Sequence, residues 1–179
     1  MDRRKTLKIT YSARFLCLAL VLPFFTGQIK IFGKMLNLMH VAIFLCGLCC
    51  GGFSGGVIGF IAPLLRSITF GIPNLYPNAV GMAFELCAYG VVAGLLYKAL
   101  FNVKGGIYIS LVASMIVGRI VWGVTTLILW SFMGDVFTFT LFIKGAFVDS
   151  VVGIVLHLII VPLIVYVLKK AGLLLINRK

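Results

Sequence analysis

Acidic side chains are nearly absent from this sequence. Of its 179 residues only 4 are Asp or Glu, against 16 Lys or Arg, and charged residues make up 11% of the chain. Hydrophobic residues make up 62%, whereas a soluble domain is about half apolar and about a quarter charged. A fold of this size has too little interior to bury so many apolar side chains. The scarcity of charge therefore excludes a soluble domain and indicates a chain surrounded by lipid.

Several functional signatures are also missing. There is no G-x-x-x-x-G-K-[S/T] loop, so we expect ATP hydrolysis to come from partners. There is no G-x-S-x-G or H-E-x-x-H motif, and Ser67, His40 and Asp149 lie in separate apolar segments, which argues against an intramembrane enzyme. The net charge of +12 is not arranged as a basic stripe with interleaved aromatics. We predict no enzymatic activity, no cofactor and no nucleic-acid partner.

The 5 cysteines do not form a disulfide or metal-binding pattern. All of them lie inside apolar runs, whereas disulfide scaffolds place cysteines in short polar loops. Cys46, Cys49 and Cys50 form a cluster, but no second Cys or His pair follows at metal-ligand spacing. We interpret these cysteines as small apolar side chains that pack between helices, and we predict no metal site.

What the sequence does contain is a series of long apolar runs. About 20 residues of helix cross the roughly 30 Å hydrocarbon core of a bilayer. We expect the apolar segment that follows the opening MDRRKTLK to be a retained first span, because no A-x-A-type cleavage site follows it. The predicted spans cover residues 11–25, 35–50, 52–70, 79–101, 107–132 and 145–168. The predicted fold is an all-α membrane protein, a six-transmembrane-helix bundle that forms a single domain over residues 1–179.

Basic residues gather on one side of this predicted topology. Six spans place both termini on the same side, together with the loop that carries Lys98 and Lys104. The opposite side carries only Lys30, Lys34 and Lys144. By the positive-inside rule both termini are cytoplasmic, and we expect a multi-pass protein of the cell membrane.

Ionisable side chains inside the spans are few, and most fall at similar depth. At about 1.5 Å per residue, the outer halves of their spans hold five of them, with His157 nearer the middle. These five are His40, Arg66, Glu85, Arg119 and Asp149. A charge in hydrocarbon costs about 2.5 to 3.5 kcal/mol, so such groups face a cavity or one another. We therefore predict one polar pocket that is open to the outside.

Alternatives remain open at this point. Arg66 could pair with Glu85, and Arg119 with Asp149, as ties that fix helix register. Trp122, one turn from Arg119, either stacks on a flat ligand ring or packs toward the membrane. A stand-alone secondary carrier or channel is the second functional class. It would spread polar residues through the full depth of the membrane or repeat its two halves.

The link between the second and third predicted spans is dense in glycine, GLCCGGFSGGVIGF. Gly47, Gly51, Gly55 and Gly59 recur at every fourth residue, and Gly51 and Gly52 are expected to break the helix rather than to lie within it. Small residues at this spacing allow two helix backbones to approach closely. The pattern predicts a tightly packed helical hairpin.

Three stretches carry a resemblance to a known family: Met39 through the glycine hairpin, then FIAPLLRSITFGIPNLYPNAVGMAFELCAYGVVAGLLYK, and GRIVWGV. Here the chain resembles the substrate-binding S components of energy-coupling factor (ECF) vitamin transporters. The resemblance implies a bundle that captures a vitamin or related cofactor precursor from outside. It also implies delivery through a complex with a transmembrane T component and two cytoplasmic ATPase subunits. No residue pattern selects one vitamin.

The resemblance also implies roles for single residues. The loop GIPNLYPN would lie at the pocket mouth, Arg66 would meet a substrate carboxylate or phosphate, and Glu85 would meet a ring nitrogen or hydroxyl, or orient the arginine. Family members contact the T component through small residues spaced A-x-x-x-A, and the nearest match is Ala13 with Cys17. The predicted substrate-binding residues are His40, Arg66, Asn74, Tyr76, Asn78, Glu85, Tyr89, Arg119, Trp122 and Asp149.

Overall fold

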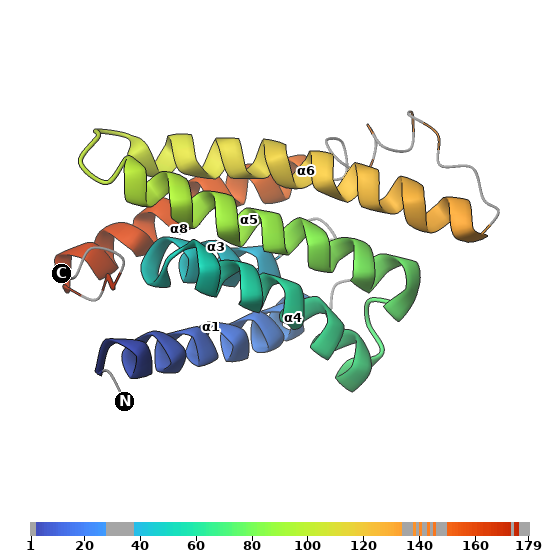
Figure 1. Cartoon of the computed structure of the whole chain (residues 1–179), viewed down its shortest axis with the longest axis horizontal. Helices are drawn as coiled ribbons and strands as arrows, with labels where there is room; N and C mark the ends of the chain where they lie inside the picture. The colour runs from blue at the N-terminus through green and yellow to red at the C-terminus, as the bar shows by residue number, and fades with distance from the viewer. Residues whose placement is uncertain are drawn as a thin grey trace.

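The structure is a computed structural model that describes residues 3–27, 38–133, 138, 140, 143, 145, 150–172 and 174–175. Every regular element within these residues is helical (Figure 1). The elements are α1 (Arg3–Gly27), α3 (Leu38–Cys50), α4 (Gly52–Phe70), the short π-helical turn η1 (Leu75–Ala79), α5 (Val80–Ala99), α6 (Gly106–Met133) and α8 (Val151–Lys170). The prediction of an all-helical bundle is confirmed for the described part of the chain.

Five stretches of helix are long and apolar enough to cross a membrane: Lys5–Phe24, Gly52–Phe70, Leu75–Ala99, Gly106–Phe132 and Val151–Lys170. The exception among the described helices is α3, which has 13 residues. At about 1.5 Å per residue it is roughly 20 Å long, shorter than the hydrocarbon core. Of the predicted span over residues 35–50, residues 35–37 lie outside the described part of the chain, and the described residues form a shorter apolar helix.

Two glycines with positive φ lie at the two ends of α4. Gly51 has φ 102° and separates α3 from α4, as predicted from the glycine pattern, whereas Gly52 does not break the helix and is the first residue of α4. Gly71 has φ 69° and its N–H donates to the carbonyl of Ser67, which ends α4 in a left-handed turn. L-residues with side chains rarely adopt this conformation, so glycine is the residue that fits both positions.

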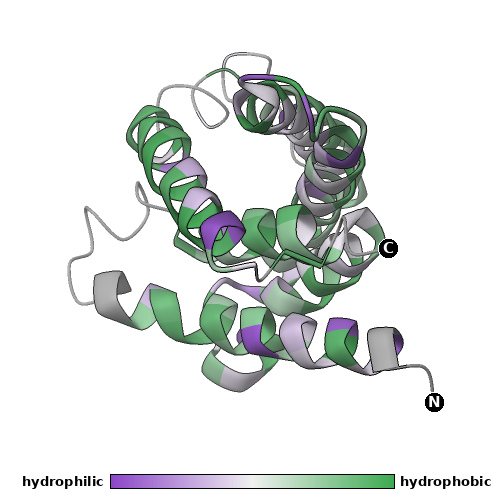
Figure 2. Cartoon of the chain, turned by 90° about the vertical axis from the view of Figure 1, so that its left-hand side faces the viewer, coloured by the Kyte–Doolittle hydropathy of each residue, from purple (hydrophilic) through white to green (hydrophobic). Residues whose placement is uncertain are grey.

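Helix α5 lies at the centre of the packing, against α3, α4 and α6. Helix α1 packs on α3 and α4, and the end-on view shows it crossing the bundle obliquely (Figure 2). Most outward faces are apolar, with exposed side chains such as Phe53, Ile68 and Ile159. A surface of this kind is stable against lipid tails, which agrees with the composition.

The glycine hairpin packs more tightly than predicted, because α5 joins it. A Cβ added to Gly47 would lie 2.6 Å from the carbonyl oxygen of Gly90, and one added to Gly55 would lie 2.6 Å from the Cα of Gly47. A Cβ on Gly94 would meet the backbone of Gly52. Three helix backbones therefore meet at a contact that only glycine allows. This contact fixes α5 against α3 and α4 below the polar residues of α5.

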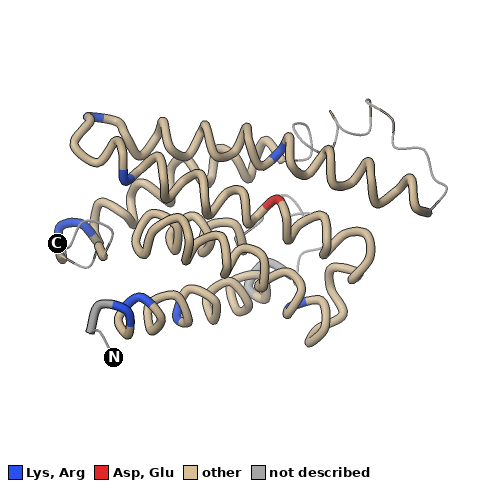
Figure 3. The backbone as a smooth tube through the Cα atoms, viewed as in Figure 1, with Lys and Arg blue, Asp and Glu red and all other residues tan. Residues whose placement is uncertain are grey.

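Both chain ends lie at the same end of the bundle, where α1 begins and α8 ends (Figure 1). All six lysines of the described part of the chain belong to segments at this end, namely Lys5, Lys8, Lys98, Lys104, Lys169 and Lys170, and Figure 3 shows most basic positions gathered there. The clustering agrees with the predicted topology. Which side of the membrane this end faces stays a prediction from the positive-inside rule.

Candidate substrate-binding site

An ion pair joins α5 and α6 inside the bundle. Arg119 Nη1 lies 2.9 Å from Glu85 Oε1, and the Tyr89 hydroxyl donates to the same oxygen at 2.7 Å. Glu85 and Tyr89 are four residues apart, so they lie on one face of α5. The Glu85 side chain is 3% exposed and the Arg119 side chain 12%. Glu85 is the one acidic residue in the part of the chain that the structure describes, which Figure 3 marks in red.

A glycine on α6 makes room for this arrangement. A Cβ added to Gly118 would collide with the ring of Tyr89, so the missing side chain leaves the space that the tyrosine ring fills. Gly118 immediately precedes Arg119 in the sequence. The close approach of α5 and α6 at Gly118 therefore sets both the place of the tyrosine and the reach of the arginine.

Four buried rings lie next to this ion pair. His40 on α3 lies 5.5 Å from Tyr89 and 5.7 Å from His157 on α8, measured between ring centroids. Phe44 lies 5.0 Å from Tyr89 and 5.7 Å from His157. The two imidazoles stack at an interplanar angle of 29°. We use the name polar cluster for Glu85, Tyr89, Arg119, His40 and His157.

The structure adds His157 to the residues expected from the sequence. From the sequence, His157 was predicted to lie near the middle of its span, deeper in the membrane than the other ionisable residues. In the structure α3 packs against α8, which brings the two histidines together. The sequence feature that could have identified His157 is the scarcity of histidine. The chain has only 2 histidines, and both lie in apolar segments.

Arg66 lies apart from the polar cluster. Its Nε donates to the carbonyl of Ile72 at 3.1 Å, its Nη1 donates to the carbonyl of Leu20 at 3.2 Å, and its guanidinium lies 5.5 Å from the ring centroid of Phe24. The interpretation of Arg66 as the partner of Glu85 is therefore wrong, because Glu85 pairs with Arg119. Arg66 joins the end of α4 to α1 and to the following loop.

The loop before α5 is held to its neighbours by hydrogen bonds. The Tyr76 hydroxyl donates to the carbonyl of Leu129 on α6 at 2.7 Å, and the Ser67 hydroxyl donates to the carbonyl of Pro73 at 2.6 Å. Asn74, Tyr76 and Asn78 are exposed. Leu129 follows Arg119 by ten residues of α6, roughly 15 Å at 1.5 Å per residue. The loop residues therefore lie toward the end of the bundle, beyond the polar cluster.

Two further predicted residues have different outcomes. Trp122 lies beside Gly81 of α5, where an added Cβ would be 3.8 Å from its Cδ1, and beside Gly145, where an added Cβ would be 2.9 Å from its Cη2. The indole thus contacts α5 and Gly145, and its stacking on a ligand stays a prediction. Asp149 lies outside the described residues, so its proposed pairing with Arg119 is untested, although Arg119 already pairs with Glu85.

The cysteine cluster shows no sign of a metal site in the described residues. Cys46, Cys49 and Cys50 are buried free thiols, and no group of three or more potential ligands is placed to hold an ion in the described part of the chain. They lie in the apolar core, in agreement with their interpretation as small packing residues.

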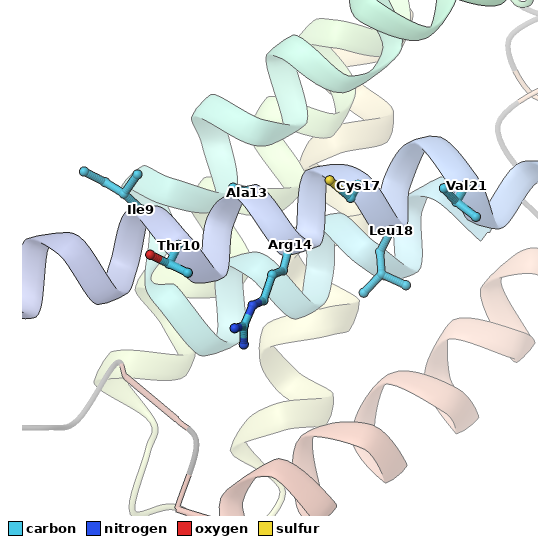
Figure 4. Close-up of a pocket in the computed structure, with 7 residues that line it drawn as sticks. All are labelled: Ile9, Thr10, Ala13, Arg14, Cys17, Leu18 and Val21. Atoms are coloured by element: carbon cyan, nitrogen blue, oxygen red, sulfur yellow. The ribbon is translucent and has the colours of Figure 1, made fainter.

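A shallow groove runs along the outer face of α1. It measures about 730 Å³ and includes the two predicted docking residues, Ala13 and Cys17 (Figure 4). The groove is lined by Ile9, Thr10, Ala13, Arg14, Cys17, Leu18 and Val21. Ala13 and Cys17 lie one helical turn apart on its floor, where their small side chains leave the helix backbone open to approach.

The sequence matches a protein-family model described as ECF transporter, substrate-specific component, over residues 7–165. No curated protein and no solved structure matches. The family match covers most of the chain and includes both the polar cluster and the α1 groove. Together with the apolar helices, it shows that this chain belongs to the family of ECF transporter substrate-specific components, which are multi-pass transporter subunits of the cell membrane and not enzymes.

Proposed function

We propose that this chain captures a vitamin-like small molecule from outside the cell and delivers it through an ATP-driven ECF complex. The observation that supports the proposal is the polar cluster, which gathers an ion pair, a phenol and two imidazoles from four helices. Polar side chains of this kind are costly in a membrane and normally serve a ligand or pathway. Ligand sites combine apolar rings with a few convergent polar groups, as this cluster does.

The residues near the end of the bundle would form the entrance. Tyr76 ties the loop before α5 to α6, and Arg66 ties the end of α4 to α1. Asn74 and Asn78 are exposed in the same loop and would contact the solute as it enters. The loop would then act as a gate above the cluster, with Trp122 and Asp149 as further contacts.

The distribution of polar groups favours capture over conduction. On the basic-end side of His157, most fully buried side chains of the described core are apolar, such as Leu48, Leu111, Val161 and Val165, although the Tyr97 hydroxyl is also buried there. The buried Ser110 and Ser114 donate to carbonyls of their own helix, α6. A stand-alone carrier or channel would need polar groups along its whole depth. The apolar core is the reason to prefer a receptor subunit.

Delivery would require partners. The T component would bind the groove on α1 through Ala13 and Cys17, because small side chains allow close contact between helices. Two cytoplasmic ATPase subunits would supply the energy, since this chain has no P-loop motif.

Native mass spectrometry of the purified protein tests the capture step. We expect the wild-type protein to carry an added small-molecule mass, and we expect Glu85→Ala and His157→Ala to lose it because both residues belong to the polar cluster. The matched control is Ile159→Ala, an exposed residue on the same helix as His157. Equal retention of the mass by all variants would contradict the site.

Reconstitution in vesicles tests the delivery step. Uptake of the identified molecule should require the T component, the ATPases and ATP, whereas vesicles with this chain alone should bind it without accumulating it. Accumulation by the chain alone would favour the stand-alone carrier instead.

A further inference from the structure

Arg119 provides the accessible side of the buried ion pair. Its side chain is 12% exposed, whereas that of Glu85 is 3% exposed. Glu85 is thus more deeply buried than the guanidinium and has less surface to offer to a solute. A solute that reaches the cluster would meet Arg119 before Glu85.

Arg119 also has donors to spare. A guanidinium presents several N–H donors in a fixed plane and no acceptor. In the part of the chain that the structure describes, Glu85 Oε1 is the acceptor that Arg119 contacts, through Nη1. That oxygen already receives a second hydrogen bond from Tyr89. Among the described contacts, Arg119 and Glu85 together therefore have more unused hydrogen-bond donors than unused acceptors. A solute group with several acceptor atoms would match this excess of donors.

The local charge leads to the same conclusion. Glu85 is the sole acidic residue of the described chain, and its charge is balanced by Arg119 alone. The neighbouring His40 and His157 add no negative charge in any protonation state. The described groups around the cluster are thus neutral or positive in sum, so an anion adds less repulsion than a cation does.

Resting on the proposed function, we infer that the solute is an organic anion whose carboxylate or phosphate binds Arg119. Glu85 is a positioning residue: it holds one edge of the guanidinium, and Tyr89 in turn holds Glu85. Carboxylate and phosphate are the groups that arginine binds with two parallel hydrogen bonds. The rings of His40 and Phe44 pack against Tyr89, and the ring of His157 packs against both of them.

Matched pairs of probes that differ only in charge test the inference. Binding to the purified protein is measured by calorimetry for pantothenate against panthenol, nicotinate against nicotinamide, and pyridoxal 5′-phosphate against pyridoxal, with thiamine as a cation. We expect at least one acidic probe to bind about tenfold or more tightly than its neutral partner, the size of one charge-assisted hydrogen bond. Tighter binding of the neutral partners or of thiamine would overturn the inference.

Substitutions then assign the preference to Arg119. Arg119→Gln alone leaves a buried carboxylate unpaired and risks misfolding, so the decisive variant is the double substitution Arg119→Gln with Glu85→Gln, which removes both charges. It should fold, keep the same melting temperature within a few degrees, and lose the preference for the acid. A folded double variant that keeps the wild-type preference would overturn the inference.

Glu85→Gln separates positioning from direct contact. Glutamine keeps an acceptor for Arg119 and Tyr89 but leaves the guanidinium without its counter-charge, so in the folded variant the acid should bind more tightly than in wild type. Loss of acid binding in this variant would mean that the Glu85 charge itself contacts the solute. Ile120→Ala, exposed on the same helix as Arg119, is the control. Failure of the folded wild type to bind any probe would contradict the proposed function together with this inference.

Discussion

At the scale of single residues, the site depends on a missing side chain as much as on those present. Tyr89 reaches Glu85 because Gly118 leaves the space for its ring. The contact explains why Gly118 on α6 affects the hydrogen bond between Tyr89 and Glu85 on α5. It also gives a substitution that changes the site without removing any polar group.

Gly118→Ala should weaken solute binding. The added methyl group would collide with the Tyr89 ring, displace it and break its hydrogen bond to Glu85. We expect affinity to fall by about tenfold, the effect of losing one hydrogen bond to a charged group. Calorimetry with the molecule that the wild-type protein carries measures the change. Ser114→Ala is the control, because the Ser114 hydroxyl bonds only to its own helix among the described residues.

The sequence singled out individual polar residues, but it did not show which of them pair with one another. The sequence identified Glu85, Arg119, His40 and Tyr89 as candidates, and the structure brings all four together. It did not identify the pairing of Arg119 with Glu85. Partner choice depends on how each helix is rotated about its axis, and these helices carry apolar residues on all faces because both lipid and core are apolar.

At the scale of elements, apolar runs and glycines predicted the helices well. The break at Gly51 and the long helices over residues 52–70 and 106–133 agree with the predicted boundaries. The contribution of α5 to the glycine contact was missed, since Gly90 and Gly94 are far in sequence from the hairpin that they join. Hydropathy shows where a helix lies but not which neighbour its glycines face.

Gly90→Ala should destabilise the bundle. A methyl group at this position would meet the carbonyl of Gly55, so α5 would have to move away from α4. Overpacking of this kind costs about 1 to 3 kcal/mol. The expected result is a lower melting temperature of the detergent-solubilised protein. Leu95→Ala, a change at an exposed position of the same helix, should leave the melting temperature nearly unchanged, and an equal loss in both variants would contradict the contact.

At the scale of the whole molecule, the two surfaces that we propose for binding and docking lie on different helices. The polar cluster belongs to α3, α5, α6 and α8, whereas the groove belongs to α1. Solute binding and partner docking should therefore respond separately to substitution.

Ala13→Phe tests this separation. A phenyl group would fill the groove and hold a partner helix away from the α1 backbone. Co-purification of the T component with this chain should be lost, while the small-molecule mass bound to the isolated protein should persist. Leu163→Phe, at an exposed position on α8, is the control for added bulk. Retained co-purification of Ala13→Phe would exclude the groove as the docking surface.

The short α3 and the apolar core around its inner end have a consequence for transport. Opening an aqueous route past Leu48, Val161 and Val165 would hydrate side chains that are now fully buried, at about 1.5 to 3 kcal/mol for each. Changing the orientation of the entire protein in the bilayer exposes none of them. We therefore expect the bound solute to cross the membrane when the whole subunit changes its orientation in the bilayer. The packing inside the subunit would stay intact during this movement.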